Sequence, residues 1–107
     1  MKAIIVQTTC AFKEEAKDIA KALIEEKLAA CVQIMPIESF FNWEGKFCSA
    51  NETLLNIKTR KENFEKVKSK IKELHSYDVP EIIQLDIANA SEEYLKFIGD
   101  NTIWVIF

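Results

Sequence analysis

Thiol and imidazole side chains are the strongest candidates for chemistry in this sequence, and they are scarce. There is a single histidine, His75, and there are three cysteines, Cys10, Cys31 and Cys48. One histidine excludes a mononuclear multi-histidine metal site within one chain. The cysteines are odd in number and form no C-x-x-C pair, which argues against a disulfide framework and a structural zinc site. Cys31 follows an apolar segment and is either inert packing or a thiolate ligand.

Motifs for nucleophilic and nucleotide chemistry are missing. A Ser-His-Asp triad would have to use His75, and the sequence contains no G-x-S-x-G elbow. The two glycines, Gly45 and Gly99, cannot form a G-x-G-x-x-G or Walker A pattern. The sequence therefore excludes dinucleotide-binding and P-loop functions of the usual kind.

Polar and aromatic residues gather at predicted strand ends and in loops, where binding groups concentrate. Trp43 lies at a predicted hairpin tip, and Tyr77 and Glu81 lie in the loop before the fourth strand. Lys58, near the end of the returning hairpin strand, forms either a simple ion pair with Glu81 or part of a binding site. His75 is either a helix cap stabilised by the helix dipole or a ligand. Trp43 is either an interface or core aromatic or a stacking platform.

Composition places these residues in one domain that spans 1–107. The chain has a mass of 12.3 kDa, 49% hydrophobic residues, two glycines and two prolines, which excludes a disordered or linker protein. It carries 14 basic and 17 acidic residues, and Arg60 is its one arginine, so we expect no nucleic-acid partner. The longest apolar runs are too short to span a bilayer. We expect a reduced cytoplasmic protein without a membrane partner.

Hydrophobic periodicity predicts the elements that must position the candidate residues. Apolar residues at intervals of three and four predict helices, and β-branched runs predict strands. Pro36 cannot donate to a ladder, so it marks an edge or a bulge where the strand bends. Glu44-Gly45 is a turn signal, and Ser91 is an N-cap. The predicted elements are strand 2–8, helix 13–27, strands 31–43 and 47–59, helix 61–74, strand 82–87, a short helix after Ser91 and a final strand 103–107.

This order, β-α-β-β-α-β with a short helix and strand appended, predicts an α+β fold. Right-handed crossovers give a four-stranded antiparallel sheet with both long helices on one face. The opposite face stays bare, and the hairpin of strands 31–43 and 47–59 is longer than a chain of 107 residues easily covers. We therefore predict a homo-oligomer, with the hairpin and the C-terminal strand as edges for pairing between subunits.

A set of segments in register carries a family resemblance over almost the whole chain. The segments are EKLAACVQI at 26–34, SFFNWEGK at 39–46, ETLLNIKT at 52–59, HSYDVPEI at 75–82 and YLKFI at 94–98. In order and spacing they resemble the CutA family, the divalent-cation tolerance proteins. The resemblance implies a ferredoxin-like fold, a tight homotrimer and a cytoplasmic role in tolerance to metals, particularly copper.

The resemblance also implies where a metal would bind. Copper-binding members use a cysteine at the end of the first strand, where this chain has Thr8, with Cys10 two residues further on. They also use a His-His pair, where this chain has Leu74 and His75. His75 is thus the matching ligand, and Cys10 is a helper if the loop turns it towards His75. We expect no required cofactor, and copper or another divalent cation as the bound metal.

Other functions stay open beside a metal-responsive trimer that is not an enzyme. A small-molecule sensor resembling the PII signalling proteins would hold an anionic metabolite in clefts between subunits, using Trp43, Lys58, Tyr77 and Glu81. An enzyme would use Lys58, Tyr77 and Glu81 as acid-base groups at a subunit junction. A structural trimer would use none of them.

Overall fold

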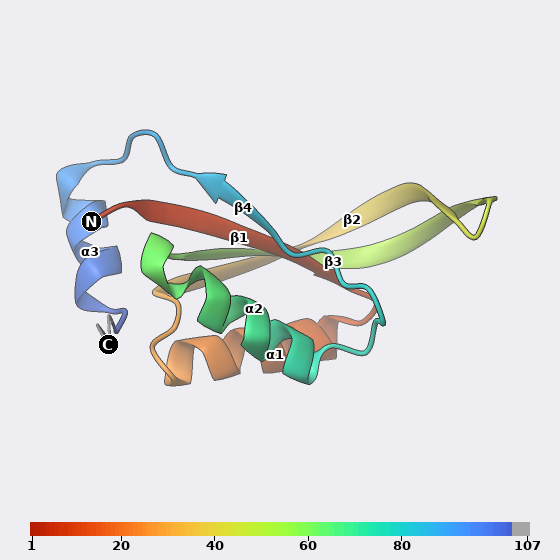
Figure 1. The fold of residues 1–107 in the computed structure, drawn as a ribbon, viewed down its shortest axis with the longest axis horizontal. Helices are drawn as coiled ribbons and strands as arrows, with labels where there is room; N and C mark the ends of the chain where they lie inside the picture. The colour runs from red at the N-terminus through yellow and green to blue at the C-terminus, as the bar shows by residue number, and fades with distance from the viewer. Residues whose placement is uncertain (104–107) are drawn as a thin grey trace.

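The computed structural model describes residues 1–103. Its strands and helices follow one another in the order β1, α1, β2, β3, α2, β4 and α3 (Figure 1). The bounds are β1 Ala3–Cys10, α1 Lys13–Glu25, β2 Cys31–Trp43, β3 Lys46–Arg60, a 3-10 turn Lys61–Asn63, α2 Phe64–Leu74, β4 Ile83–Asp86 and α3 Glu92–Asp100. The order confirms the predicted α+β fold class. The predicted strand 103–107 lies outside the described residues apart from Ile103, which is not in a strand.

The strands form one antiparallel sheet in the order β2-β3-β1-β4. Two strands adjacent in sequence, β2 and β3, pair as a hairpin, whereas α1 forms the crossover from β1 to β2 and α2 the crossover from β3 to β4. Both of these helices lie against the same face of the sheet (Figure 1). This is the ferredoxin-like arrangement, and α3 is added at the end of the sheet away from the hairpin tip.

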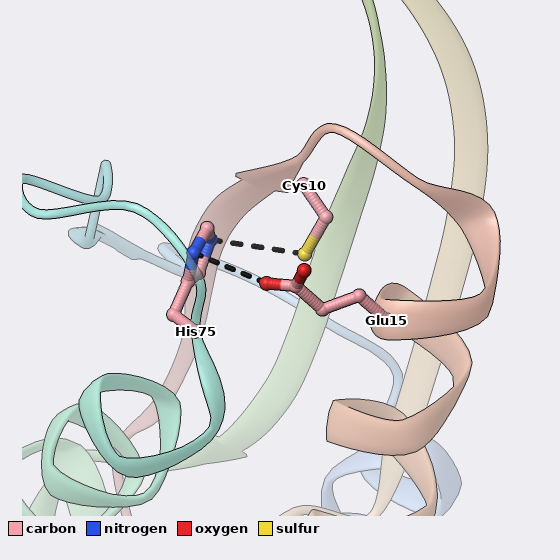
Figure 2. Close-up of side chains that lie close together, drawn as sticks. All are labelled: Cys10, Glu15 and His75. Carbon is pink, nitrogen blue, oxygen red and sulfur yellow. Dashed lines mark hydrogen bonds and ion pairs between the residues drawn. The ribbon is translucent and has the colours of Figure 1, made fainter.

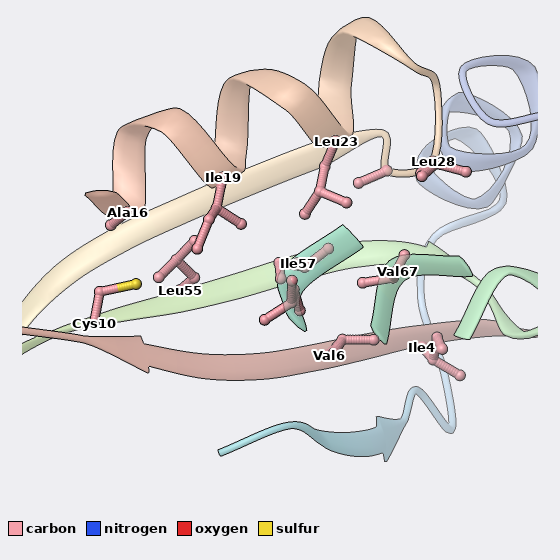
Figure 3. Close-up of a cluster of buried hydrophobic side chains, with 12 residues drawn as sticks. Ile4, Val6, Cys10, Ala16, Ile19, Leu23, Leu28, Leu55, Ile57 and Val67 are labelled. Atoms are coloured by element: carbon pink, nitrogen blue, oxygen red, sulfur yellow. The ribbon is translucent and has the colours of Figure 1, made fainter. Parts of the chain in front are cut away.

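The core lies between this sheet face and the two helices. Alternate residues of the central strands point towards the helices, because successive side chains of a strand face opposite sides. These residues meet the apolar stripes of α1 and α2 (Figure 3). Each such side chain contributes roughly 1.5–3 kcal/mol on burial. Fully buried members are Ile4, Val6, Leu55 and Ile57 of the sheet, Ile19 and Leu23 of α1, and Val67 and Ile71 of α2.

The hairpin of β2 and β3 extends well past the helices and makes the molecule elongated, with a longest extent of 44 Å (Figure 1). Its register is continuous from the pair Cys31 and Lys58 to the pair Trp43 and Lys46. Pro36 is paired with Thr53 inside this ladder, so the predicted alternative of a bulge is wrong. The alternative of an edge is confirmed, since β2 is the outer strand, where a missing N–H is tolerated.

The end of the first strand and the end of the first helix each differ from the prediction by two residues. The first strand runs to Cys10 rather than Thr8, because β1 stays paired with β3 as far as the pair Cys10 and Thr53. Helix α1 ends at Glu25 rather than Lys27, since Lys27 adopts a left-handed φ of 56°. Leu28 N then donates to Leu23 O at 2.9 Å, which closes the helix end.

The sheet face opposite α1 and α2 keeps apolar side chains exposed. Register places Ile5, Leu54, Met35 and Leu85 on this face, since each is offset by one residue from its core-facing neighbour. Met35 is 48% exposed and Leu85 is 44% exposed. Within residues 1–103 no element covers this central part of the face (Figure 1).

Candidate functional site

Three metal-ligating side chains converge at the end of the sheet where β1 stops. Cys10 is the last residue of β1, Glu15 lies in the first turn of α1, and His75 directly follows α2. Cys10 Sγ is 3.7 Å from His75 Nε2, and His75 Nδ1 is 3.3 Å from Glu15 Oε1 (Figure 2). One ligand atom from each residue lies within 4.8 Å of the others. Cys10 thus faces His75, from the last position of β1 rather than from the loop that follows it.

Glu15 was missed as a site residue, and the local fold explains its position. Helix α1 begins three residues after β1 ends, so its first turn lies over the end of that strand. The carboxylate is then held by Ser76, whose N–H and Oγ each donate to it at 2.8 Å. The signal in the sequence was an acid in the first turn of a helix that begins three residues after a cysteine.

Hydrogen bonds assign one tautomer to the His75 ring, whose side chain is fully buried. The N–H of Tyr77 donates to Nδ1 at 3.1 Å, so Nδ1 is an acceptor. The other nitrogen, Nε2, then carries the proton and donates to the carbonyl of Thr9 at 2.7 Å. The contact between Nδ1 and Glu15 becomes an ion pair only if the ring is protonated, which would displace the Tyr77 N–H. In the neutral ring both nitrogens are occupied.

The thiol of Cys10 is fully buried and is held in its neutral form. Burial, followed by the nearby negative charges of Glu15 and Glu52, raises the pKa of Cys10 to about 12. Sulfur, imidazole nitrogen and carboxylate oxygen are a donor set that suits borderline cations such as Zn²⁺ and copper. The donor types therefore fit a metal, and binding would have to displace the thiol proton and release one imidazole nitrogen.

Thr8 and Leu74 occupy the two positions where the resemblance implied copper ligands, and neither has a side chain of the expected type. Thr8 is buried on the core-facing side of β1, and its Oγ1 has no hydrogen-bond partner within residues 1–103. Leu74 is 39% exposed at the end of α2. Neither supplies a ligand beside His75.

A cleft of about 750 Å³ lies next to this cluster. It is bounded by the distal part of β2, by Glu52 of β3, by Thr9 of β1 and by the loop between α2 and β4. Thr9 pairs with Leu54, and Glu52 pairs with Ile37, so the register places the cleft on the sheet face opposite the helices. Three of the predicted cleft residues line it, namely Trp43, Tyr77 and Glu81.

Aromatic rings and carboxylates dominate the cleft. The aromatic residues are Phe40, Phe41, Trp43 and Tyr77, and the acidic residues are Glu52, Asp78 and Glu81. The hydroxyl of Tyr77 donates to Glu52 Oε2 at 2.8 Å. Burial and this hydrogen bond raise the pKa of Tyr77. Partial burial against the cleft, followed by the negative charge of Glu52, raises the pKa of Glu81.

Lys58, the fourth residue of the predicted cleft between subunits, does not line this cleft within one chain. It lies on the same sheet face but six residues from Glu52 along β3, a separation of roughly 20 Å in an extended strand. Its Nζ donates to Tyr94 Oη at 3.3 Å and lies 5.2 Å from the centre of the Tyr94 ring. The ion pair with Glu81 considered from the sequence is therefore replaced by a contact with α3.

Solved structures with the same architecture place the chain in a class. A structure from Archaeoglobus fulgidus, described as a periplasmic divalent cation tolerance protein CutA, matches with a TM-score of 0.91 and 43% identity, covering 92% of this chain and 97% of that one. CutA1 from Oryza sativa matches with a TM-score of 0.93 and 42% identity, covering 96% and 95%. Among the described residues, no helix is long and apolar enough to cross a bilayer. The class is a small ferredoxin-like α+β protein with a long hairpin.

Sequence relatives narrow the class to one family. Residues 4–101 match the family described as CutA1 divalent ion tolerance protein. The divalent-cation tolerance protein CutA of Thermus thermophilus is 46% identical over 99 residues, which are 92% of this chain and 96% of that relative. A chloroplastic CutA of Arabidopsis thaliana is 44% identical over 100 residues, 92% of this chain and 55% of that relative. The chain belongs to the CutA family of divalent-cation tolerance proteins.

Proposed function

We propose that this chain acts in tolerance or response to divalent metals by binding copper or another soft or borderline cation at Cys10, Glu15 and His75. The names of its relatives support the role in cation tolerance. The observation that carries the site is the convergence of sulfur, nitrogen and oxygen ligand atoms within 4.8 Å, with His75 brought from 65 residues away to Cys10. Three ligands leave a position for water or for a further ligand.

Protonation sets the conditions for binding. Because the pKa of Cys10 is about 12, the thiol is neutral near pH 7, and a metal that binds sulfur releases its proton. The imidazole must also lose one of its hydrogen bonds, either the one from the Tyr77 N–H to Nδ1 or the one from Nε2 to the Thr9 carbonyl. Affinity should therefore rise with pH, by about tenfold per pH unit for one displaced proton.

The test is an anaerobic titration of the apoprotein with Cu(I) and, separately, with Zn²⁺, followed by competition with a chelator of known affinity. The wild type should bind one ion per chain. Both His75→Ala and Cys10→Ser should weaken binding by at least about tenfold. Cys48→Ser, on the distal hairpin, is the matched thiol control and should change nothing. Affinity that is independent of pH from 6 to 8, or is unchanged in His75→Ala, would remove this site.

A role in binding rather than catalysis is part of the proposal, as is a cytoplasmic location. Within one chain Lys58 contacts Tyr94, whereas Tyr77 and Glu81 line the cleft, so the acid-base group considered from the sequence would need a junction between subunits. Three free thiols are typical of a reducing compartment. The homotrimer is proposed as well, and the exposed apolar sheet face supports it.

A sensor function remains the second candidate because a cleft of about 750 Å³ is large enough for a small molecule. Lys58 does not line this cleft within one chain, so a neighbouring subunit would have to bring it to the anionic metabolite expected from the sequence. Thermal shift against nucleotides and common metabolites tests it, since a ligand of the native state raises the melting temperature. If no anionic compound raises it, this alternative has no support.

A further inference from the structure

We propose that the cleft between the distal part of β2 and the loop 75–82 binds a small organic cation, an ammonium or guanidinium group attached to an apolar body. This ligand differs from the metal of the proposed function, and its site does not use Cys10. It also reverses the charge expected of a sensor ligand from the sequence. Charge, aromatic surface and size each support the assignment.

The charge of the lining has one sign. Glu52, Asp78 and Glu81 line the cleft, whereas the lining residues, all within 1–103, include no lysine, arginine or histidine. Glu52 and Glu81 are close enough for the charge of Glu52 to raise the pKa of Glu81. Carboxylates that repel each other and are partly desolvated gain stability from a cation placed between them. An anion would meet only negatively charged groups among the charged residues that this chain contributes.

Aromatic side chains supply the second requirement. Ser39, Phe41 and Trp43 lie on one side of β2, because they are two residues apart along the strand. Trp43 is 51% exposed and Phe41 is 42% exposed, so their ring faces are available to a ligand. Aromatic faces attract cations, tryptophan most strongly, and this attraction favours large, weakly hydrated organic cations over small hydrated metal ions.

Size and rigidity complete the argument. The volume of about 750 Å³ exceeds what a bare ion needs and matches pockets that hold small molecules. The back of the cleft is held in place, since Tyr77 Oη donates to Glu52 at 2.8 Å and the Tyr77 N–H donates to His75. The His75 and Tyr77 rings are also in contact, with centroids 4.7 Å apart. One carboxylate is thus oriented before the ligand arrives.

Isothermal titration calorimetry with three probes of one skeleton tests the proposal on the protein as purified. Phenethylammonium carries a positive charge, phenethyl alcohol is neutral and phenylacetate is negative. Phenethylammonium should bind at least about tenfold more tightly than the alcohol, and phenylacetate should not bind. Equal affinity for all three probes, a preference for phenylacetate, or no binding because another chain fills the cleft would overturn the proposal.

Variants separate this site from the metal cluster. Glu81→Gln and Trp43→Ala should each weaken phenethylammonium binding by roughly tenfold. Glu62→Gln, an exposed acid in the 3-10 turn, is the charge-matched control and should leave binding unchanged. Cys10→Ser should still bind phenethylammonium, and Glu81→Gln should still bind metal. Loss of phenethylammonium binding in Glu62→Gln, or its retention in both Glu81→Gln and Trp43→Ala, would contradict the assignment.

Discussion

At the scale of single residues, the helix-facing side of β1 contains both apolar and polar atoms. Thr8 lies between Val6 and Cys10 on this side and is fully buried. Its Oγ1 lacks a hydrogen-bond partner in the described chain. Thr59, buried on the neighbouring strand, donates instead to the carbonyl of Leu28 at 2.6 Å. Two threonines in one core therefore differ in whether their hydroxyls are satisfied.

This difference gives opposite expectations for one substitution. Thr8→Val replaces an unsatisfied hydroxyl by a methyl group of the same shape and should raise the free energy of unfolding by about 1 kcal/mol. Thr59→Val should lower it by about 1–2 kcal/mol, because the Leu28 carbonyl loses its short hydrogen bond and keeps only the one from Asn63 Nδ2 at 3.5 Å. Urea denaturation at fixed protein concentration measures both. A loss of stability in Thr8→Val would indicate a buried water bonded to that hydroxyl.

At the scale of elements, the turn that joins β2 and β3 depends on left-handed backbone conformations. Glu44 has a φ of 52° and Gly45 a φ of 76°. Positive φ at both central residues is typical of the two-residue hairpin turn whose twist matches the strands. A Cβ at Gly45 would meet no atom within 4 Å, so any penalty there is conformational rather than steric. The other glycine, Gly99, lies inside α3 without a positive φ.

The two glycines should therefore respond in opposite directions to alanine. Gly45→Ala should lower the free energy of unfolding by about 1 kcal/mol, the usual penalty of a left-handed residue with a side chain. Gly99→Ala should raise it by up to about 1 kcal/mol, since alanine favours the helix. A Cβ at Gly99 would meet Met1 Sδ at 3.7 Å, an ordinary contact. Equal effects in urea denaturation would mean that the hairpin turn tolerates any residue.

At the scale of the whole molecule, the sheet has one covered and one uncovered face. The exposed side chains of Met35, Ile83 and Leu85 lie on the uncovered face, next to Ile5 and Leu54. Apolar surface of this kind typically marks an interface between proteins. A second and third copy of the chain would cover it and would border the cleft, which lies on the same face.

Analytical ultracentrifugation at micromolar concentration should give three times the chain mass of 12.3 kDa. Leu85→Lys places a charge on the uncovered face and should lower the mass or weaken the association. Ile24→Lys, at a residue 41% exposed on α1, is the matched control and should leave the mass unchanged. A wild-type mass of one chain would refute the trimer.

Much of this protein could be predicted from its sequence because the relevant signals are local. The two strand faces of β3, the apolar stripes of α1 and α2, and the N-cap Ser91 follow from spacings of two to four residues. The hairpin turn at Glu44-Gly45 and the edge position of Pro36 follow from backbone chemistry at single positions. These features determined the element order and, with the handedness of crossovers, the fold.

Only the tertiary structure decided which distant residues meet. Cys10 and His75 are 65 residues apart, and their contact depends on β1 continuing to Cys10 and on α2 ending beside it. Glu15 joins them because α1 starts within three residues of that strand end. Lys58 lies six residues from Glu52 along β3 and outside the cleft, so the charged residues with which one chain lines the cleft are all acidic. Side-chain periodicity is set by neighbours along the chain, whereas these encounters depend on strand register and helix ends, which the packed core determines.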